Sequence, residues 1–177
     1  MTKRVVWKDN GIVSLKLRDN LYTLGQMLGK ANMRFFNITS IDGDWSDIDL
    51  NKVDPIFTLF IGKVVLQNLV DTNIKDKRIK PNSKPLEKHW ISAHLNYDGG
   101  SLFKGGDLID IGEDVNIGST QGTIIKQNLS LETDRQIIET HELTNIYGDN
   151  HVRDRLLNFF DTGKDVDPLK AEVFAGL

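Results

Sequence analysis

Apolar and polar residues alternate over two short runs near the start of the chain, on either side of Arg18-Asp19-Asn20. The apolar members of these runs are Ile12, Leu15, Leu17, Leu21, Leu24, Met27 and Leu28. Alternation with a period of two residues is typical of a half-buried β-strand, and Asp and Asn favour tight turns. The pattern therefore predicts a β-hairpin over residues 11–28, with Gly25 marking a bulge in its second strand. A third strand is expected from Met33 to Ile38.

Beyond residue 40, short apolar segments are separated by polar stretches. A nearly continuous apolar run predicts a buried strand from Ile56 to Leu66. Residues 71–88 are polar and basic and contain two prolines, so they predict an exposed connector and a possible subdomain boundary. The segments expected after it are a strand around Trp90 to Tyr97, glycine-rich turns from Gly99 to Gly106, and extended stretches over residues 124–131 and 136–147.

A late segment, residues 150–160, has apolar side chains at spacings of three to four residues and predicts a helix that ends before Gly163. We expect the acidic tail after Asp161 to be loosely held. The pattern as a whole predicts a mainly β (α+β) fold, with a small curled antiparallel sheet or SH3-like barrel and a C-terminal extension containing one helix. A length of 177 residues is consistent with a single domain.

Composition narrows the function classes. The net charge of −3 and a pI of about 5.8 do not provide the broad basic field that drives binding to phosphate backbones. The absence of cysteine excludes disulfides, thiolate zinc sites and cysteine nucleophiles. The first residues turn polar after Val5, Val6 and Trp7, without the apolar stretch of a signal peptide, so we expect a cytoplasmic protein.

Residues 41–54 form an acidic segment, and it is the first candidate site. Its central acidic and aromatic residues are Asp42, Asp44, Trp45, Asp47 and Asp49. Clustered carboxylates suggest calcium, but a calcium loop that began at Asp42 would have Val53 in place of its closing glutamate. Two interpretations remain: a solvated acidic loop, or a partner-binding loop in which Trp45 is an exposed anchor and the aspartates face a basic surface.

Other possible catalytic, metal-binding and phosphate-binding motifs lack a required residue at the required spacing. His141-Glu142 begins a zinc-protease pattern, but Asn145 occupies the position of the second histidine. His89 and His94 are an odd number of positions apart, so on one strand they would face opposite sides. In the Gly99–Gly106 stretch, Gly106 and Asp107 occupy the positions where a phosphate loop has a lysine and a hydroxyl residue. We therefore predict no catalytic residue, no metal site and no cofactor.

The segment VSLKLRDNLYTLGQMLGKANMRFFNI (residues 13–38), followed by an acidic spacer and IFTLFIGKVVLQNLV (residues 56–70), resembles the immunity proteins of bacterial polymorphic toxin and contact-dependent growth inhibition systems. The resemblance is to their all-β family numbered twenty-six. It rests on apolar alternation, an aromatic-x-x-Gly-Gln step at Tyr22 to Gln26, and the paired aromatics Phe35-Phe36. It covers about the first 70 residues and leaves out the extension beyond Gly100.

The resemblance implies a cytoplasmic protein that binds the C-terminal domain of its cognate toxin, often a nuclease, and neutralises it without catalysis. It implies no direct contact with nucleic acid or a membrane. An acidic protein would complement the basic groove of a nuclease, so we expect the toxin-binding residues to be the five in the 41–54 segment.

Two other function classes remain open. One is an enzyme whose site is assembled from scattered ionisable groups around His94 or His141. The other is an RNA or ribonucleoprotein adaptor that uses a small barrel and the basic stretch from Lys75 to Lys88.

Overall fold

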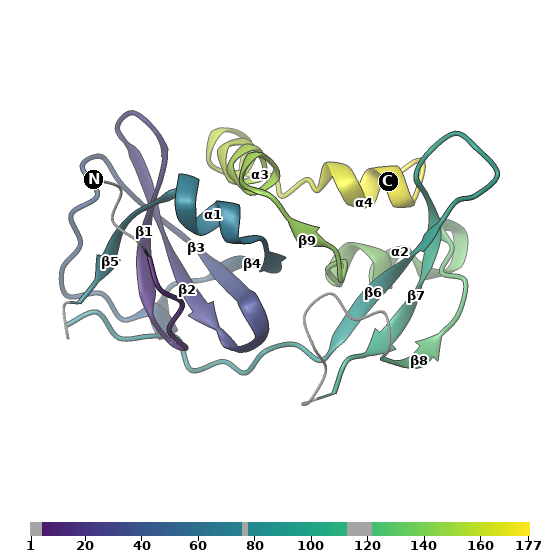
Figure 1. The fold of residues 1–177 in the computed structure, drawn as a ribbon, viewed down its shortest axis with the longest axis horizontal. Helices are drawn as coiled ribbons and strands as arrows, with labels where there is room; N and C mark the ends of the chain where they lie inside the picture. Colours follow the sequence, from purple (N-terminus) through teal and green to yellow (C-terminus); the bar gives the residue numbers. More distant parts are fainter. Residues whose placement is uncertain (1–4, 76–77, 113–121) are drawn as a thin grey trace. The chain divides into compact units, whose positions relative to one another are not determined.

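The computed structural model of this protein describes residues 5–75, 78–112 and 122–177. The chain divides into two compact units, drawn together in Figure 1. The first unit lies within residues 1–86 and 147–165, and the second within residues 87–146 and 166–177. The chain first leaves the first unit after Leu86, near the end of the predicted connector.

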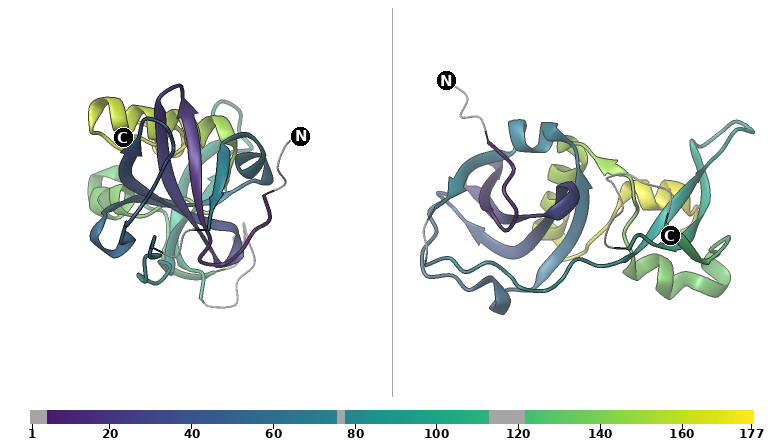
Figure 2. Two further views of the ribbon diagram at one scale, coloured as in Figure 1. Left: turned by 90° about the vertical axis from the view of Figure 1, so that its left-hand side faces the viewer. Right: turned by 60° about the horizontal axis from the view of Figure 1, so that its bottom comes forward.

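The first unit is built on a curled antiparallel sheet, in which the described residues form six strands in the order β5-β1-β2-β3-β4-β9. Figure 2 shows how this sheet curls around itself. The predicted mainly β fold with a curled sheet is confirmed. The strand bounds are β1 (Ile12–Arg18), β2 (Leu21–Leu28), β3 (Asn32–Ser40), β4 (Pro55–Ile61), β5 (Val70–Ile74) and β9 (Ile146–Tyr147), with short 3₁₀ turns at Gly29–Ala31 and Leu50–Lys52.

The N-terminal hairpin is confirmed. Arg18 pairs with Leu21, so Asp19 and Asn20 form the connection, and Asn20 adopts a left-handed conformation (φ 59°) that Asn tolerates well. The predicted bulge is also present, because the register between β2 and β3 shifts between Thr23 and Gly25.

The strand predicted from Ile56 to Leu66 is wrong in its second half. β4 ends at Ile61. Gly62 is the N-cap of the helix α1 (Lys63–Asn68), in which Val65 and Leu66 are buried. A short apolar run is compatible with both a buried strand and a buried turn of helix. The spacing of apolar residues therefore could not predict that the strand ends and a helix begins within this run.

The segment predicted as an exposed connector is partly a core element. Its first residues form β5, which pairs antiparallel with β1. Ile79 is only 4% exposed and belongs to the hydrophobic cluster on this side of the sheet. Residues 76 and 77 of the predicted connector lie outside the described residues.

Residues 81–88 contain no helix or strand, as their two prolines predict, yet buried polar side chains hold them against the sheet. The Asn82 backbone N–H donates to Gln26 Oε1 at 2.8 Å. The Arg34 guanidinium, which is almost fully buried, donates to the carbonyls of Lys84 (2.7 Å) and Pro85 (2.9 Å).

The predicted late helix is confirmed as α3 (Asp149–Thr162), which contacts β1 and α1 in the first unit. It ends at Gly163, whose left-handed conformation (φ 73°) lets its N–H donate to Phe159 O. Arg155 is buried on this helix. Its guanidinium lies 4.1 Å from the centre of the Phe57 ring and donates to both carboxylate oxygens of Asp165 at 2.6 and 2.7 Å.

The second unit contains a smaller antiparallel sheet, β6 (His89–Leu95), β7 (Phe103–Asp110) and β8 (Thr123–Lys126), with the helices α2 (Leu131–Thr140) and α4 (Pro168–Val173). Residues 136–147 were predicted to be extended, and this prediction is wrong for residues 136–140, which belong to α2. Only Leu131, Ile137 and Ile138 are apolar in this helix, too few to show a helical period, and a kink lies at Asp134 (φ −125°, ψ 17°). The core cluster consists of Ile91, Leu108, Leu129, Ile138, Leu143, Val173 and Phe174.

Two further expectations about this part of the chain are corrected. The tail is not loosely held, because α4 packs on β7 and Val173 and Phe174 are buried. The turn interpretation holds for Gly99 and Gly100 but is wrong for Gly105 and Gly106, which lie within β7.

Candidate functional site

The acidic segment 41–54 packs on one face of β1, β2 and β3. Trp45 reaches this face, where its indole N–H donates to the buried Ser14 Oγ at 2.9 Å. Its ring packs against the cluster formed by Ile12, Leu24, Phe36, Leu50 and Ile79. Trp45 is therefore half-buried, so the expectation that its side chain is exposed is wrong, while its role as a toxin-binding residue stays a prediction.

The first part of the segment is a closed turn. Ser40 Oγ accepts from the Gly43 backbone N–H at 3.0 Å and donates to Asp42 Oδ1 at 2.7 Å. Gly43 has a φ of 80°, and a Cβ there would lie 2.9 Å from the Tyr22 ring. The close approach of the backbone to Tyr22 holds this turn against the sheet.

The second part of the segment is joined to the connector. Leu50 is fully buried, and its N–H donates to Lys80 O at 3.0 Å, while the Lys80 N–H donates to Ile48 O at 2.8 Å. Asn51 extends this link, because its amide donates to Pro81 O and its Oδ1 accepts from the backbone N–H and hydroxyl of Ser83. Two segments far apart in sequence therefore form one layer.

Asp42 and Asp44 are both exposed and are linked directly. The Asp44 backbone N–H donates to Asp42 Oδ1 at 3.0 Å. The Ser40 hydroxyl, and then this N–H, lower the pKa of the Asp42 carboxyl because they stabilise its charged form. Asp42 is therefore a fixed negative charge at neutral pH, next to a second exposed carboxylate.

Asp47 and Asp49 each have a partner within the first unit, Asp47 in the connector and Asp49 in its own turn. Asp47 has a left-handed backbone (φ 52°) and its Oδ2 lies 3.5 Å from Arg78 Nη1, with both side chains exposed. Asp49 caps the 3₁₀ turn, accepting from the side chain (2.9 Å) and backbone N–H (3.1 Å) of Asn51, and these two donors lower the pKa of its carboxyl. The structure thus places the predicted residues in one loop but leaves Asp42 and Asp44 as its open acidic face.

The histidines of the second unit do not form one group. His94 Nε2 lies 3.1 Å from Asp107 Oδ2, whereas His89 Nε2 lies 3.9 Å from Asp110 Oδ2. The His89 and His141 rings are 6.3 Å apart. Within the described ranges, no group of three or more His, Cys, Asp or Glu side chains is placed to hold a metal ion.

The described residues make a mainly β protein with a curled sheet and a loop fixed across one of its faces. The chain belongs to the family described as Domain of unknown function (DUF8309), which matches residues 2–177. No curated protein and no solved structure matches the chain. Among the helices that the structure describes, none has the length and apolar character needed to cross a membrane.

Proposed function

We propose that this protein is a cytoplasmic immunity protein, which binds the C-terminal domain of a contact-dependent growth inhibition toxin and neutralises it without catalysis. The observation that carries the proposal is the acidic loop, whose Trp45, Leu50 and Asn51 attach it to the sheet and the connector while Asp42 and Asp44 face solvent. The resemblance of residues 13–70 to immunity proteins supplies the class of partner.

A fixed acidic loop suits an inhibitor for a physical reason. Ordering a loop on binding costs free energy, and a loop that is already held by its own contacts avoids most of that cost. Exposed carboxylates steer a basic partner into contact and raise the association rate. Trp45 then contributes by holding the loop in place, and the open aspartates make the contact. The proposal includes no cofactor and no direct contact with nucleic acid or a membrane.

The test is co-purification with the toxin domain encoded immediately upstream, followed by kinetics with the double variant Asp42→Asn and Asp44→Asn. An amide keeps an acceptor oxygen for the Asp44 N–H, so the loop geometry should survive while two charges are lost. We expect association to slow by about threefold to tenfold, and the difference from the wild type to shrink as salt is added.

Asp154→Asn provides the matched control, because it removes a carboxylate that is 66% exposed on α3 and outside the loop. It should leave the association rate unchanged. The proposal fails if no complex with the toxin domain forms and the protein gives no protection from that toxin. If a complex forms but both variants behave alike, the acidic loop is not the contact.

A further inference from the structure

A cavity of about 730 Å³ lies in the first unit, between the N-terminal segment, the end of β5 and the connector. Its volume falls within the range of roughly 300–1,000 Å³ that is usual for sites of small organic ligands. The sequence pattern had no signal for it, because its walls come from three separate parts of the chain. Its lining residues are Val6, Trp7, Lys8, Asn10, Gly11, Ile12, Met27, Asn73, Ile74, Lys75, Ile79 and Pro81.

The lining is mainly apolar. Ile12, Met27 and Ile79 contribute side chains that are nearly fully buried, so the base of the cavity is firmly packed. The Trp7 indole N–H already donates to Leu28 O (3.1 Å) and Asp9 Oδ1 (3.2 Å). Its ring therefore adds apolar area without an unsatisfied donor. An alkyl chain is the kind of ligand that such a lining takes from water.

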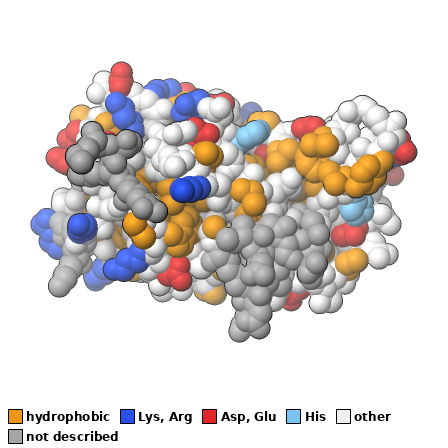
Figure 3. All heavy atoms as spheres, viewed as in Figure 1, with side chains coloured by type: hydrophobic (Ala, Val, Ile, Leu, Met, Phe, Trp, Pro, Cys, Tyr) orange, Lys and Arg blue, Asp and Glu red, His pale blue; other side chains and the backbone are white. Residues whose placement is uncertain are grey.

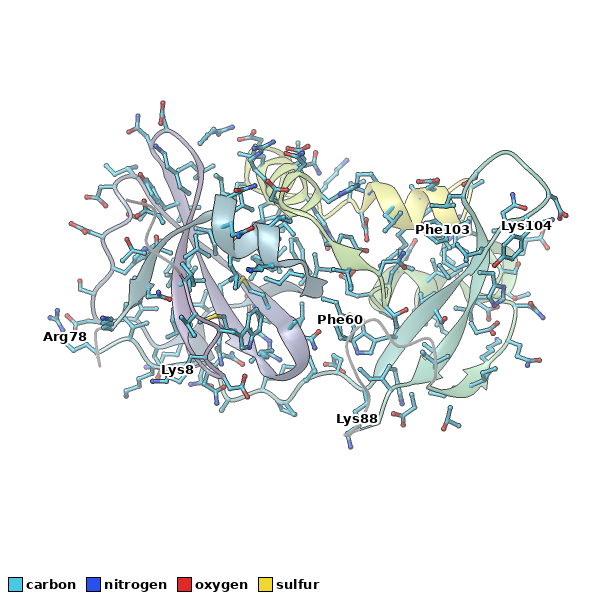
Figure 4. All side chains as sticks on the ribbon, viewed as in Figure 1. Lys8, Phe60, Arg78, Lys88, Phe103 and Lys104 are labelled. Carbon is cyan, nitrogen blue, oxygen red and sulfur yellow. The ribbon has the colours of Figure 1, made fainter. Side chains whose placement is uncertain are left out.

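Lys8 and Lys75 are the charged side chains among the described residues that line the cavity. Both are exposed, and no acidic residue is found among the described lining residues. Figure 3 shows hydrophobic side chains open to the surface on this unit with lysine and arginine side chains near them, and Lys8 is labelled in Figure 4. Two ammonium groups beside an apolar cavity complement an anionic head group attached to an apolar chain.

We propose that this cavity binds a free single-chain anionic amphiphile of the fatty-acid type, with its alkyl chain against Val6, Trp7 and Ile74, the apolar lining side chains that keep accessible area, and its carboxylate beside Lys8 and Lys75. No described residue of the 41–54 segment lines the cavity, although Ile12 and Ile79 also belong to the cluster against which Trp45 packs. The inference does not depend on the identity of the partner of that loop.

The first test is calorimetric titration of the full chain with octanoate, decanoate and dodecanoate, each below its micelle concentration. Burying one methylene should tighten binding by about fourfold, so affinity should rise steeply along the series. Decanol, which has the chain without the charge, should bind at least about tenfold more weakly than decanoate. Equal binding of decanol would overturn the role of the two lysines.

Variants locate the site. The double variant Lys8→Gln and Lys75→Gln should weaken dodecanoate binding by about tenfold. The corresponding control is Lys63→Gln, an exposed lysine on α1, which should have no effect. Ile74→Trp enlarges a lining side chain on the strand face that Ile74 shares with Ile12, and should abolish binding. Thr72 lies two positions earlier on the same face, is exposed and does not line the cavity, so Thr72→Trp should bind like the wild type.

Three results would overturn the inference. One is the absence of saturable dodecanoate binding. Another is binding that survives Ile74→Trp, because the ligand would then occupy a different place. The third is binding of phosphatidylglycerol vesicles without binding of monomeric dodecanoate, which would assign the lysines to a membrane surface. Circular dichroism of each variant checks that loss of binding does not result from unfolding.

Discussion

Gly25 shows at the residue scale how closely this sheet is packed. A Cβ added to it would lie 2.8 Å from the sulfur of Met33 and 2.9 Å from a methyl carbon of Leu15. Both neighbours are fully buried and have little room to shift. The glycine thus lets β1 and β3 bring large side chains over β2 at the bulge, where the sheet curls.

Gly25→Ala should therefore lower the free energy of unfolding by about 1–3 kcal/mol, because overpacking forces buried side chains out of their preferred positions. Urea unfolding followed by circular dichroism measures the change. Gly29→Ala is the matched control, since a Cβ there meets nothing within 4 Å, and it should change stability by no more than about 0.5 kcal/mol. Equal stability of the two variants would contradict the packing described for Gly25.

At the scale of elements, Asp134 joins β8 to α2. Its buried carboxylate accepts from the Lys126 ammonium, from the Ser130 backbone N–H at 3.1 Å and from the Thr133 hydroxyl at 2.9 Å. The hydrogen bond from Lys126 is the largest cause of a lowered pKa for Asp134. The Asp134 carboxylate thus accepts the backbone N–H of the N-cap residue Ser130 and links β8 to α2 through Lys126.

The lowered pKa predicts how stability depends on pH. A carboxyl group with a lower pKa in the folded state than in the unfolded state stabilises the fold fully above its unfolded pKa, which is about 4. That stabilisation is lost as the pH falls through the folded-state pKa. Asp134→Asn should therefore lower Tm at neutral pH and flatten the fall of Tm below about pH 4.

Thermal unfolding at a series of pH values provides the measurement for Asp134. The control is Asp154→Asn, which removes an exposed carboxylate on α3 and should leave both the neutral-pH Tm and its acid dependence near those of the wild type. An Asp134→Asn curve that runs parallel to the wild type would show that this carboxyl is not responsible for the acid loss.

At the scale of the whole molecule, the chain completes its two units in an interleaved order. Residues 147–165 return to the first unit, and residues 166–177 belong to the second. Val173 and Phe174 are 3% and 5% exposed in the core of the second unit, so the end of the chain is part of its packing.

Phe174→Ala should destabilise the second unit by about 3–5 kcal/mol, the usual cost of removing a buried phenylalanine ring. Amide hydrogen exchange should lose protection in β6 and β7 while protection in β1 to β4 stays the same. Leu177→Ala is the control, because this side chain is 40% exposed, and it should change neither the stability of the second unit nor the protection of β6 and β7. A matching loss of protection in β1 to β4 would show that the two units unfold as one.

Sequence patterns predicted features that depend on neighbours along the chain. The hairpin over residues 11–28, the bulge at Gly25 and the helix before Gly163 each have a local signal, in alternation, in turn residues or in a helix period. The helix α1 was missed because its apolar run has no distinctive period. The helix α2 was missed because its apolar residues, Leu131, Ile137 and Ile138, are too few to show a helical period.

For the candidate site, the sequence identified the acidic residues but not their environment. It placed Trp45 in the solvent, whereas the indole bonds to Ser14 on β1, 31 positions away. Asp47 and Asp49 were grouped with Asp42 and Asp44 by spacing alone. Only the folded chain shows that Asp47 faces Arg78 and that Asp49 caps its own turn. No sequence pattern predicted the cavity beside Lys8 and Lys75.

The sequence by itself determined the mainly β character, the N-terminal hairpin and the acidity of residues 41–54, because each depends on side chains a few positions apart. The tertiary structure alone decided that the loop and the connector form one layer. That layer depends on pairs such as Asn51 and Ser83, 32 positions apart, and the hydrogen bond from Asn82 to Gln26, 56 positions apart, holds it on β2. Buried polar side chains must find such partners, and the folded chain selects which ones.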